Sequence, residues 1–342
     1  MMASKTRCGL VGCGVIGPKH ARILKSLPSA ELIAVCDIVP ERAQKLGEEL
    51  SVEWLTSLDE LIARDDIECI NICTPSGMHG DMAIAAMRAG KHVIVEKPMD
   101  ITLDKIDAMI KTAEETGRIL AGIFNYRFNS ASIKIKQAVE EGRLGKLVLG
   151  DAYVKWYRSQ AYYDSGDWRG TWALDGGGSL MNQSVHFIDL LQWIMGPVES
   201  LSANVATLAH KDIEVEDVAT ATLKFKNGAL GVIEGTTSVT PANPGRLEIH
   251  GTKGTIILEE DKITRWSIEG EEELLDTQDA TLATSDPGAL ALEGHAAEIA
   301  HVLDVIQNGG KPAVDGVQAR RAVEIILAIY ESARTGKKVV LG

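Results

Sequence analysis

The chain has 342 residues, a length that fits two domains better than one. Hydrophobic residues make up 45% of it and charged residues 24%, a balance that can bury sizeable cores. The formal net charge of -13 argues against nucleic acid and anionic membrane surfaces as partners. No apolar run reaches the roughly 18 residues of a membrane span, and the glycines after the basic N-terminus do not fit an export signal.

The five cysteines all fall in the first quarter of the chain, without a CxxC pair. They are Cys8, Cys13, Cys36, Cys69 and Cys73, and most stand within apolar runs. We therefore expect buried, reduced thiols rather than a disulfide framework or a metal site, and a cytoplasmic protein.

The first 125 residues alternate short apolar runs with helix-like segments. The pattern predicts strands at 7–11, 31–36, 67–73, 92–95 and 119–124, and helices at 16–26, 40–49, 57–63, 78–89 and 102–116. Thr102 is a candidate N-cap, and Gly90 and Gly117 stand where helices should end. Because most strand runs are continuously apolar, the alternation predicts a doubly wound parallel sheet in a domain spanning 1–125.

The rhythm changes after residue 125. The pattern predicts a helix at 130–141, a long strand at 146–157, a polar and aromatic loop at 158–175 and a helix at 178–195. From 198 to 268, strand-like runs are joined by turn pairs such as Asn227-Gly228 and Lys253-Gly254, which indicates a mainly antiparallel sheet. Helices at 291–307 and 316–334 close the chain, so 126–342 is predicted to form an α+β domain.

A glycine pattern follows the first predicted strand, in the order Gly12-Cys13-Gly14-Val15-Ile16-Gly17. A strand enters this turn and a helix leaves it, the context in which GxGxxG indicates a dinucleotide site. Gly12 permits the tight turn, Gly14 lets the backbone approach a pyrophosphate, and Gly17 lets the helix pack on the strand. The helix N-terminus then offers unpaired N–H groups to the phosphates. The alternative is a tight turn without a ligand.

Asp37 ends the second predicted strand, twenty residues after Gly17. A carboxylate there accepts bonds from both ribose hydroxyls and would repel a 2′-phosphate, so NAD is favoured over NADP as cofactor. Arg42 lies nearby and could accommodate that phosphate or stack on adenine.

Two further segments follow strands, at the edge where open α/β sheets bind ligands. They are Thr74-Pro75-Ser76 and Glu96-Lys97-Pro98. Removing hydride from a carbinol carbon also requires loss of the hydroxyl proton, and Lys97 could hold or deprotonate that hydroxyl. Taken alone, a lysine before proline is more often a surface cation.

Asn182 and His186 stand four residues apart after the run Gly176-Gly177-Gly178. In a helix this spacing places both on one face, close to Asp189. His186 can relay a proton at neutral pH. Among apolar neighbours, however, a histidine is more often a hydrogen-bonded core residue.

Taken in order, GCGVIG, CD, TPSGMH, VEKP and GGGSLMNQSVHFIDLLQW resemble the glucose–fructose oxidoreductase / inositol dehydrogenase family (Gfo/Idh/MocA). The resemblance extends to the closing segments, 295–305 and 316–341. It implies an NAD-binding Rossmann domain and an α+β substrate domain with a mainly antiparallel open sheet. It also implies a homo-oligomer, dimer or tetramer, assembled through that sheet.

The resemblance also implies roles for single residues. Lys97 matches the family's active-site lysine and His186 its proton-transferring histidine. Segments lining the nicotinamide half of the cofactor are matched by Thr74, Pro75, His79, Glu96 and Lys97, and less closely by Asn125, Trp168 and Arg169. Val15 and Ile16 belong to the glycine turn. The candidates for substrate contact are Tyr126, Arg158, Gln160, Tyr163, Asn182 and His186; the four from Tyr126 to Tyr163 could equally be linker residues.

One departure concerns Asn182, because members that resemble inositol dehydrogenase carry aspartate there. An amide is no base, yet it still donates and accepts hydrogen bonds. The change leaves proton transfer to Lys97 and His186 and argues against an inositol substrate.

The leading hypothesis is an NAD-dependent oxidoreductase that exchanges hydride between NAD and a secondary alcohol of a sugar, sugar acid or polyol. An alternative is a glycosidase or lyase that oxidises its substrate transiently and recycles the cofactor. A second alternative is a non-catalytic regulator that responds to a dinucleotide. Retention of Lys97 and His186 argues against the regulator.

Overall fold

The computed structural model describes residues 5–275 and 292–342. Within these residues the chain forms two compact units, one comprising 5–125 and 292–320, the other 126–275 and 321–342. None of the described helices is both long enough and apolar enough to cross a membrane.

The first unit is built around a parallel sheet of order β3-β2-β1-β4-β5-β6. Its strands are β1 (Thr6–Val11), β2 (Ala30–Cys36), β3 (Glu53–Leu55), β4 (Cys69–Ile72), β5 (His92–Val95) and β6 (Leu120–Gly122). The strand order reverses between β1 and β4, which is where doubly wound sheets bind ligands. The predicted parallel sheet is confirmed. The edge strand β3 was not predicted, because its three residues are largely exposed and form no apolar run.

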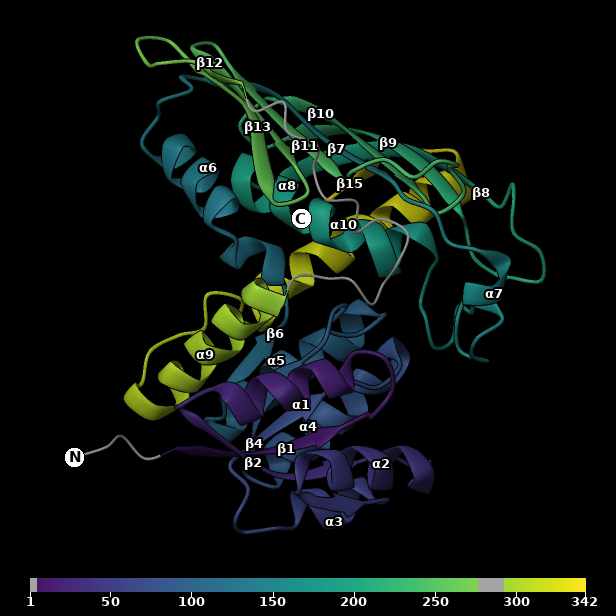
Figure 1. Ribbon diagram of the computed structural model, residues 1–342. Coiled ribbons are helices and arrows are strands. Elements are labelled where there is room, and N and C mark those ends of the chain that lie inside the picture. Colours follow the sequence, from purple (N-terminus) through teal and green to yellow (C-terminus); the bar gives the residue numbers. More distant parts are fainter. Residues whose placement is uncertain (1–4, 276–291) are drawn as a thin grey trace. The chain divides into compact units, whose positions relative to one another are not determined.

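The helices of the first unit follow its strands in sequence (Figure 1). They are α1 (Gly17–Ser26), α2 (Pro40–Leu50), α3 (Leu58–Ile62), α4 (His79–Arg88) and α5 (Leu103–Thr116), all close to their predicted ranges. Gly117 ends α5 with a φ of 63°, a left-handed conformation that glycine adopts without strain. Thr102 is the N-cap of α5 but its side chain makes no capping bond.

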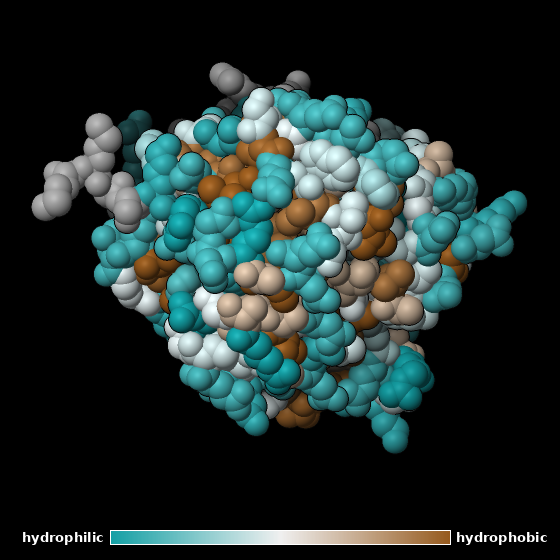
Figure 2. All heavy atoms as spheres, turned by 90° about the horizontal axis from the view of Figure 1, so that it is seen from below, coloured by the Kyte–Doolittle hydropathy of each residue, from teal (hydrophilic) through white to brown (hydrophobic). Residues whose placement is uncertain are grey.

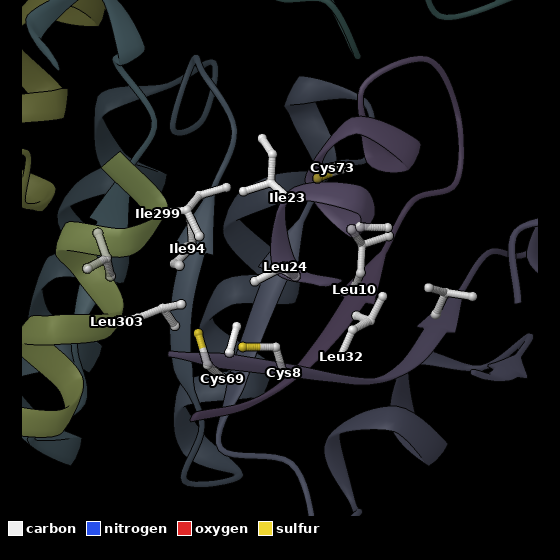
Figure 3. Close-up of a cluster of buried hydrophobic side chains, with 14 of the residues drawn as sticks. Cys8, Leu10, Ile23, Leu24, Leu32, Cys69, Cys73, Ile94, Ile299 and Leu303 are labelled. Carbon is white, nitrogen blue, oxygen red and sulfur yellow. The ribbon is translucent and has the colours of Figure 1, made fainter. Parts of the chain in front are cut away.

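Helix α9 (Leu292–Asn308) packs in the core of the first unit. The prediction that all of 126–342 forms the second domain is corrected, because 292–320 belong to the first unit. Its residues Ile299 and Leu303 are fully buried and lie beside Ile94 of β5 (Figure 3). The apolar face of the helix shows in the sequence, but the sheet that it covers does not. Residue 291, which the prediction included in this helix, lies outside the described residues.

The second unit holds a sheet of order β14-β13-β12-β11-β7-β10-β9-β8-β15. Its strands are β7 (Leu147–Lys155), β8 (Val198–Ala206), β9 (Val218–Phe225), β10 (Leu230–Thr236), β11 (Arg246–Gly251), β12 (Gly254–Glu259), β13 (Lys262–Ile268), β14 (Leu274–Leu275) and β15 (Val339–Val340). β7 and β10 run parallel and the other pairs are antiparallel, which confirms the mainly antiparallel sheet. The two-residue strands β14 and β15 were too short to predict.

Helices lie against one face of this second sheet, with α8 contacting β7 and β11 (Figure 1). They are α6 (Ser130–Glu140), α8 (Val185–Met195) and α10 (Gly316–Thr335), whose first turn belongs to the first unit. Two details differ from prediction. The loop at 158–175 contains the short helix α7 (Gln160–Tyr163), and the segment before α8 is a π-helix (Ser179–Ser184).

Charged and polar side chains cover much of the surface. On the face seen in Figure 2, hydrophilic residues separate small apolar areas, in keeping with the net charge of -13. All five cysteines are free and buried, as expected.

Candidate functional site

The glycine turn after β1 has the shape that a dinucleotide pyrophosphate requires. Gly12 has a φ of 96°, and a Cβ there would lie 2.5 Å from the carbonyl oxygen of Cys73. A Cβ on Gly17 would lie 1.8 Å from the carbonyl oxygen of Gly12, so only glycine fits either position. A Cβ on Gly14, in contrast, would meet nothing within 4 Å. The turn therefore leaves open space beside the N-terminus of α1, where phosphates bind.

Asp37 fixes this turn to the end of β2. One carboxylate oxygen accepts the N–H of Cys13 at 2.7 Å and the other accepts the N–H of Val39 at 2.9 Å. Each carboxylate oxygen has a second lone pair that can accept a ribose hydroxyl. The side chain of Val15 is 60% exposed beside the turn, and Arg42 is exposed on α2.

Asn125 offers a further polar atom. It is 4% exposed, and its Oδ1 is buried without a hydrogen-bond partner among the described residues. Such an atom needs a donor from elsewhere. The glycine turn, Asp37 and Asn125 therefore fit a bound dinucleotide.

Glu96 supports Lys97 from inside the protein. Its Oε2 accepts the N–H of Lys97 at 3.0 Å, and its Oε1 lies 2.8 Å from Nε2 of His20 and 3.7 Å from Nε2 of His295. Burial alone would raise the pKa of Glu96, but the hydrogen bonds from the two histidines hold it well below its usual range. Both carboxylate oxygens of Glu96 thus have internal partners, while its predicted contact with the cofactor stays a prediction.

His20 lies on α1 and is completely buried. Burial lowers its pKa, but Cys73 and Glu96 raise it well above the usual value, which describes a buried ion pair with Glu96. Neither His20 nor His295 was predicted at the site, because 275 positions separate them in the sequence.

His79 joins the two loops that follow β4 and β5. Its Nδ1 lies 2.8 Å from the carbonyl oxygen of Pro98, and its Nε2 lies 2.8 Å from that of Thr74. Burial lowers the pKa of the ring. The segments of Thr74 and Pro98 were predicted to lie at one edge of the sheet, and His79 contacts both of them.

In the second unit, Glu216 fixes the glycine run that precedes the π-helix. Its carboxylate accepts the N–H groups of Gly178 and Leu180 at 2.9 and 2.8 Å, and the hydroxyl of Ser179 at 3.3 Å. A Cβ on Gly178 would lie 1.8 Å from the carbonyl oxygen of Glu216, so the close approach requires glycine. Burial raises the pKa of Glu216 to about 7. Sequence reasoning missed this carboxylate, which anchors the segment that carries Asn182 and His186.

His186 and Asn182 keep internal contacts within the second unit. The ring of His186 is 6% exposed and lies 5.0 Å from the ring of Tyr126. Asn182 donates from Nδ2 to Oδ1 of Asp175 at 2.7 Å, and the other oxygen of Asp175 accepts the N–H of Gly170 at 2.9 Å. This bond orients the amide, so Oδ1 of Asn182 is its acceptor end. The π-helix also means that the predicted α-helical spacing does not hold between these two residues.

Two arginines share one aromatic ring near this segment. The guanidinium carbon of Arg169 lies 4.2 Å from the ring centre of Tyr162, and that of Arg158 lies 5.6 Å from it. Tyr162 accepts a hydrogen bond from Gln183 of the π-helix at 3.1 Å. Burial, and to a smaller extent the charge of Arg169, lowers the pKa of Arg158. Two like charges close together form an environment that favours an anion.

The other candidates for substrate contact have side-chain partners within the second unit. Tyr126 donates to Glu260 at 3.3 Å, Gln160 exchanges two hydrogen bonds with Lys211 at 2.9 Å, and Tyr163 pairs with Thr237 at 2.9 Å. Arg169 also lies 4.6 Å from the ring of Trp168. Roles of these residues toward ligands stay predictions.

Comparison with known proteins gives one family for both units. Residues 6–124 match the model of an oxidoreductase family with an NAD-binding Rossmann fold, and 132–257 match the GFO/IDH/MocA C-terminal domain. Among the relatives, myo-inositol 2-dehydrogenase of Thermotoga maritima is 29% identical over 98% of both chains. The hydratase of 2,7-anhydro-N-acetylneuraminate from Mediterraneibacter gnavus is 29% identical over 72% of this chain and 65% of its own.

A solved structure is also similar over the whole length. The WlbA dehydrogenase of Bordetella pertussis, in complex with NADH and UDP-GlcNAcA, superimposes with a TM-score of 0.88. It is 34% identical, and the match covers 99% of each chain.

Proposed function

Because the chain belongs to the Gfo/Idh/MocA family of NAD-dependent sugar and polyol dehydrogenases, we propose that its substrate is a sugar acid whose secondary alcohol is oxidised. The observation that carries the choice of an acid is the pair of arginines on Tyr162. A neutral polyol would leave these two positive charges close together without an anion from the ligand, whereas a carboxylate accepts bidentate hydrogen bonds from a guanidinium group.

We assign the following roles in this oxidation. Bound NAD supplies the acceptor for the hydride that leaves the carbinol carbon. Lys97 holds the hydroxyl and takes its proton as the carbonyl forms, and His186 relays that proton. Arg158 and Arg169 hold the carboxylate and so fix which hydroxyl faces the nicotinamide, because hydride transfer needs the reacting atoms in a near-attack geometry.

The complex of the WlbA dehydrogenase supports this substrate class, since UDP-GlcNAcA carries the carboxylate of a uronic acid. We therefore propose a uronic acid, either free or linked to a nucleoside diphosphate. The similarity to a hydratase favours a second candidate, in which oxidation is transient and the cofactor is restored.

A substrate panel tests the proposal. Uronic acids and UDP-GlcNAcA are compared with the matching neutral sugars, and NADH is followed by absorbance. We expect NADH to accumulate with the acids. Product formation without net NADH would favour the transient route, and a preference for neutral sugars would contradict the assignment. R158Q should weaken the apparent affinity for the acids alone, whereas K97A should lower kcat by about 100-fold or more while NAD still binds.

We also propose a homo-oligomer, dimer or tetramer, assembled through the sheet face that does not bear α6 and α8, and a cytoplasmic location. The five free, buried thiols support the location, because reducing compartments keep such cysteines reduced. Light scattering of the purified protein tests the assembly. A monomer at micromolar concentration would contradict it.

A further inference from the structure

A buried histidine connects Arg158 to a buried carboxylate. Nε2 of His210 lies 2.8 Å from the carbonyl oxygen of Arg158, and its Nδ1 lies 3.0 Å from Oδ2 of Asp217. The side chain of His210 is 5% exposed and that of Asp217 is fully buried. The ring of Tyr163 packs against that of His210 in an edge arrangement, with the ring centres 4.6 Å apart. Three neighbours, Arg158, Asp217 and Tyr163, therefore fix the position of His210.

Asp217 is itself held by the backbone of the turn that carries His210. Its carboxylate accepts the N–H groups of Leu208, Ala209 and His210 at 2.8, 2.9 and 2.9 Å. Burial alone would raise the pKa of Asp217, but these bonds and the one to His210 hold it below its usual range. A carboxylate with this many donors is a rigid support.

Both ring nitrogens of His210 face acceptors, a carboxylate on one side and a peptide carbonyl on the other. Nδ1 lies 3.0 Å from Oδ2 of Asp217 and Nε2 lies 2.8 Å from the carbonyl oxygen of Arg158, so the ring connects the two groups.

The peptide of Arg158 is held at both ends. Its N–H donates to the carbonyl oxygen of Thr237 at 2.8 Å, and its carbonyl oxygen accepts from His210. The guanidinium group extends from this fixed peptide to the rings of Trp156 and Tyr162, 5.5 and 5.6 Å from its carbon. Without His210 one of the two backbone anchors is lost, and the buried carbonyl loses its donor.

We infer that His210, braced by Asp217, is a positioning residue that sets the Arg158 guanidinium for the anionic group of the substrate. The inference rests on the proposed function. It predicts that His210 contributes to recognition of the acid and leaves the redox step unaffected.

Steady-state kinetics of the full chain with NAD test this inference. Glucuronate and UDP-GlcNAcA serve as acids, with glucose and UDP-N-acetylglucosamine as the counterparts whose sugar lacks the carboxylate. H210A should raise KM for the acid by about tenfold, the worth of one lost hydrogen bond, with kcat kept within about twofold. KM for the neutral sugar should not change. H210Q, which can still donate to the carbonyl of Arg158, should have a smaller effect and keeps the test available if H210A does not fold.

A double-mutant cycle with R158Q shows whether His210 acts through Arg158. In the R158Q background, H210A should cause no further loss, because the group it positions is already gone. H250A is the matched control, since His250 also pairs with a carboxylate in the second unit, on β11, and should leave both KM values unchanged. Equal losses on acid and neutral sugar, or additive effects in the double variant, would overturn the role of His210 alone. If R158Q itself shows no selectivity for the acid, the proposed function fails as well.

Discussion

Glu216 should make the stability of the second unit fall as the pH rises from acidic to neutral. Burial raises the pKa of this carboxyl from 4.5 to about 7 in the folded protein. An acid with a raised folded pKa binds its proton more tightly when folded, so its stabilising contribution is complete below pH 4.5. That contribution is lost as the pH rises toward 7.

The magnitude follows from the size of the shift. A difference of about 2.5 pKa units at 1.36 kcal/mol each corresponds to about 3 kcal/mol in the free energy of unfolding. This is a sizeable part of the roughly 5–15 kcal/mol that separates folded from unfolded domains. The source is desolvation, which outweighs the hydrogen bonds to the carboxylate, the largest of them from the N–H groups of Leu180 and Gly178.

E216Q isolates this contribution because glutamine resembles the protonated acid and does not titrate. Urea unfolding is measured between pH 4.5 and 8 for both proteins. Tryptophan fluorescence reports mainly on the second unit, since five of the six tryptophans lie between residues 156 and 266. The stability of the wild type relative to E216Q should fall by about 3 kcal/mol across this range. E234Q, at a partly exposed carboxylate paired with Lys155, is the control. Parallel curves for wild type and E216Q would refute the reasoning.

Two further predictions concern the first unit. D37N should reduce the preference for NAD over NADP by at least about tenfold, because it removes the charge that repels a 2′-phosphate. Isothermal titration with both cofactors measures the ratio. R42A, which should not reduce the preference in the same way, is the control. H20N should lower the free energy of unfolding by about 3 kcal/mol, because removing one partner of a buried ion pair leaves the charge of Glu96 with fewer compensating contacts. R22Q, which breaks the exposed pair of Arg22 and Glu49, is the control. Equal denaturation midpoints for H20N and wild type would rule out this role for His20.

The sequence predicted the role of a residue where a motif requires a particular backbone conformation at a particular place, such as a tight turn or the end of a strand. Gly12, Gly17 and Asp37 are examples, because a tight turn and a strand end determine what the residues can do. The segments of Thr74 and Pro98 were likewise predicted at strand ends, whereas the contact of His79 with Pro98 became known only from the structure.

The partners that support these residues were not predictable in the same way. His295 reaches Glu96 from α9, and no periodicity in that helix tells which sheet it covers. Glu216, just before β9, contacts the glycine run, and Asp175, in a loop, contacts Asn182. The sequence pattern of neither segment indicates these contacts. Their burial depends on tertiary packing, and a charged residue in a polar stretch gives no sign of it.

The amide at residue 182, where members that resemble inositol dehydrogenase carry aspartate, fits the proposed acidic substrate. Asp175 lies 2.7 Å from the amide of Asn182 and also acts electrostatically on Tyr162, the ring that Arg158 and Arg169 share. An aspartate at 182 would face Asp175 at hydrogen-bond distance, and one of the two carboxyls would have to keep a proton. If both ionised, their charges would offset those of the arginines and leave little attraction for an anion. With asparagine at 182, the carboxylate of the proposed sugar acid would meet the two arginines without a second carboxylate beside Asp175.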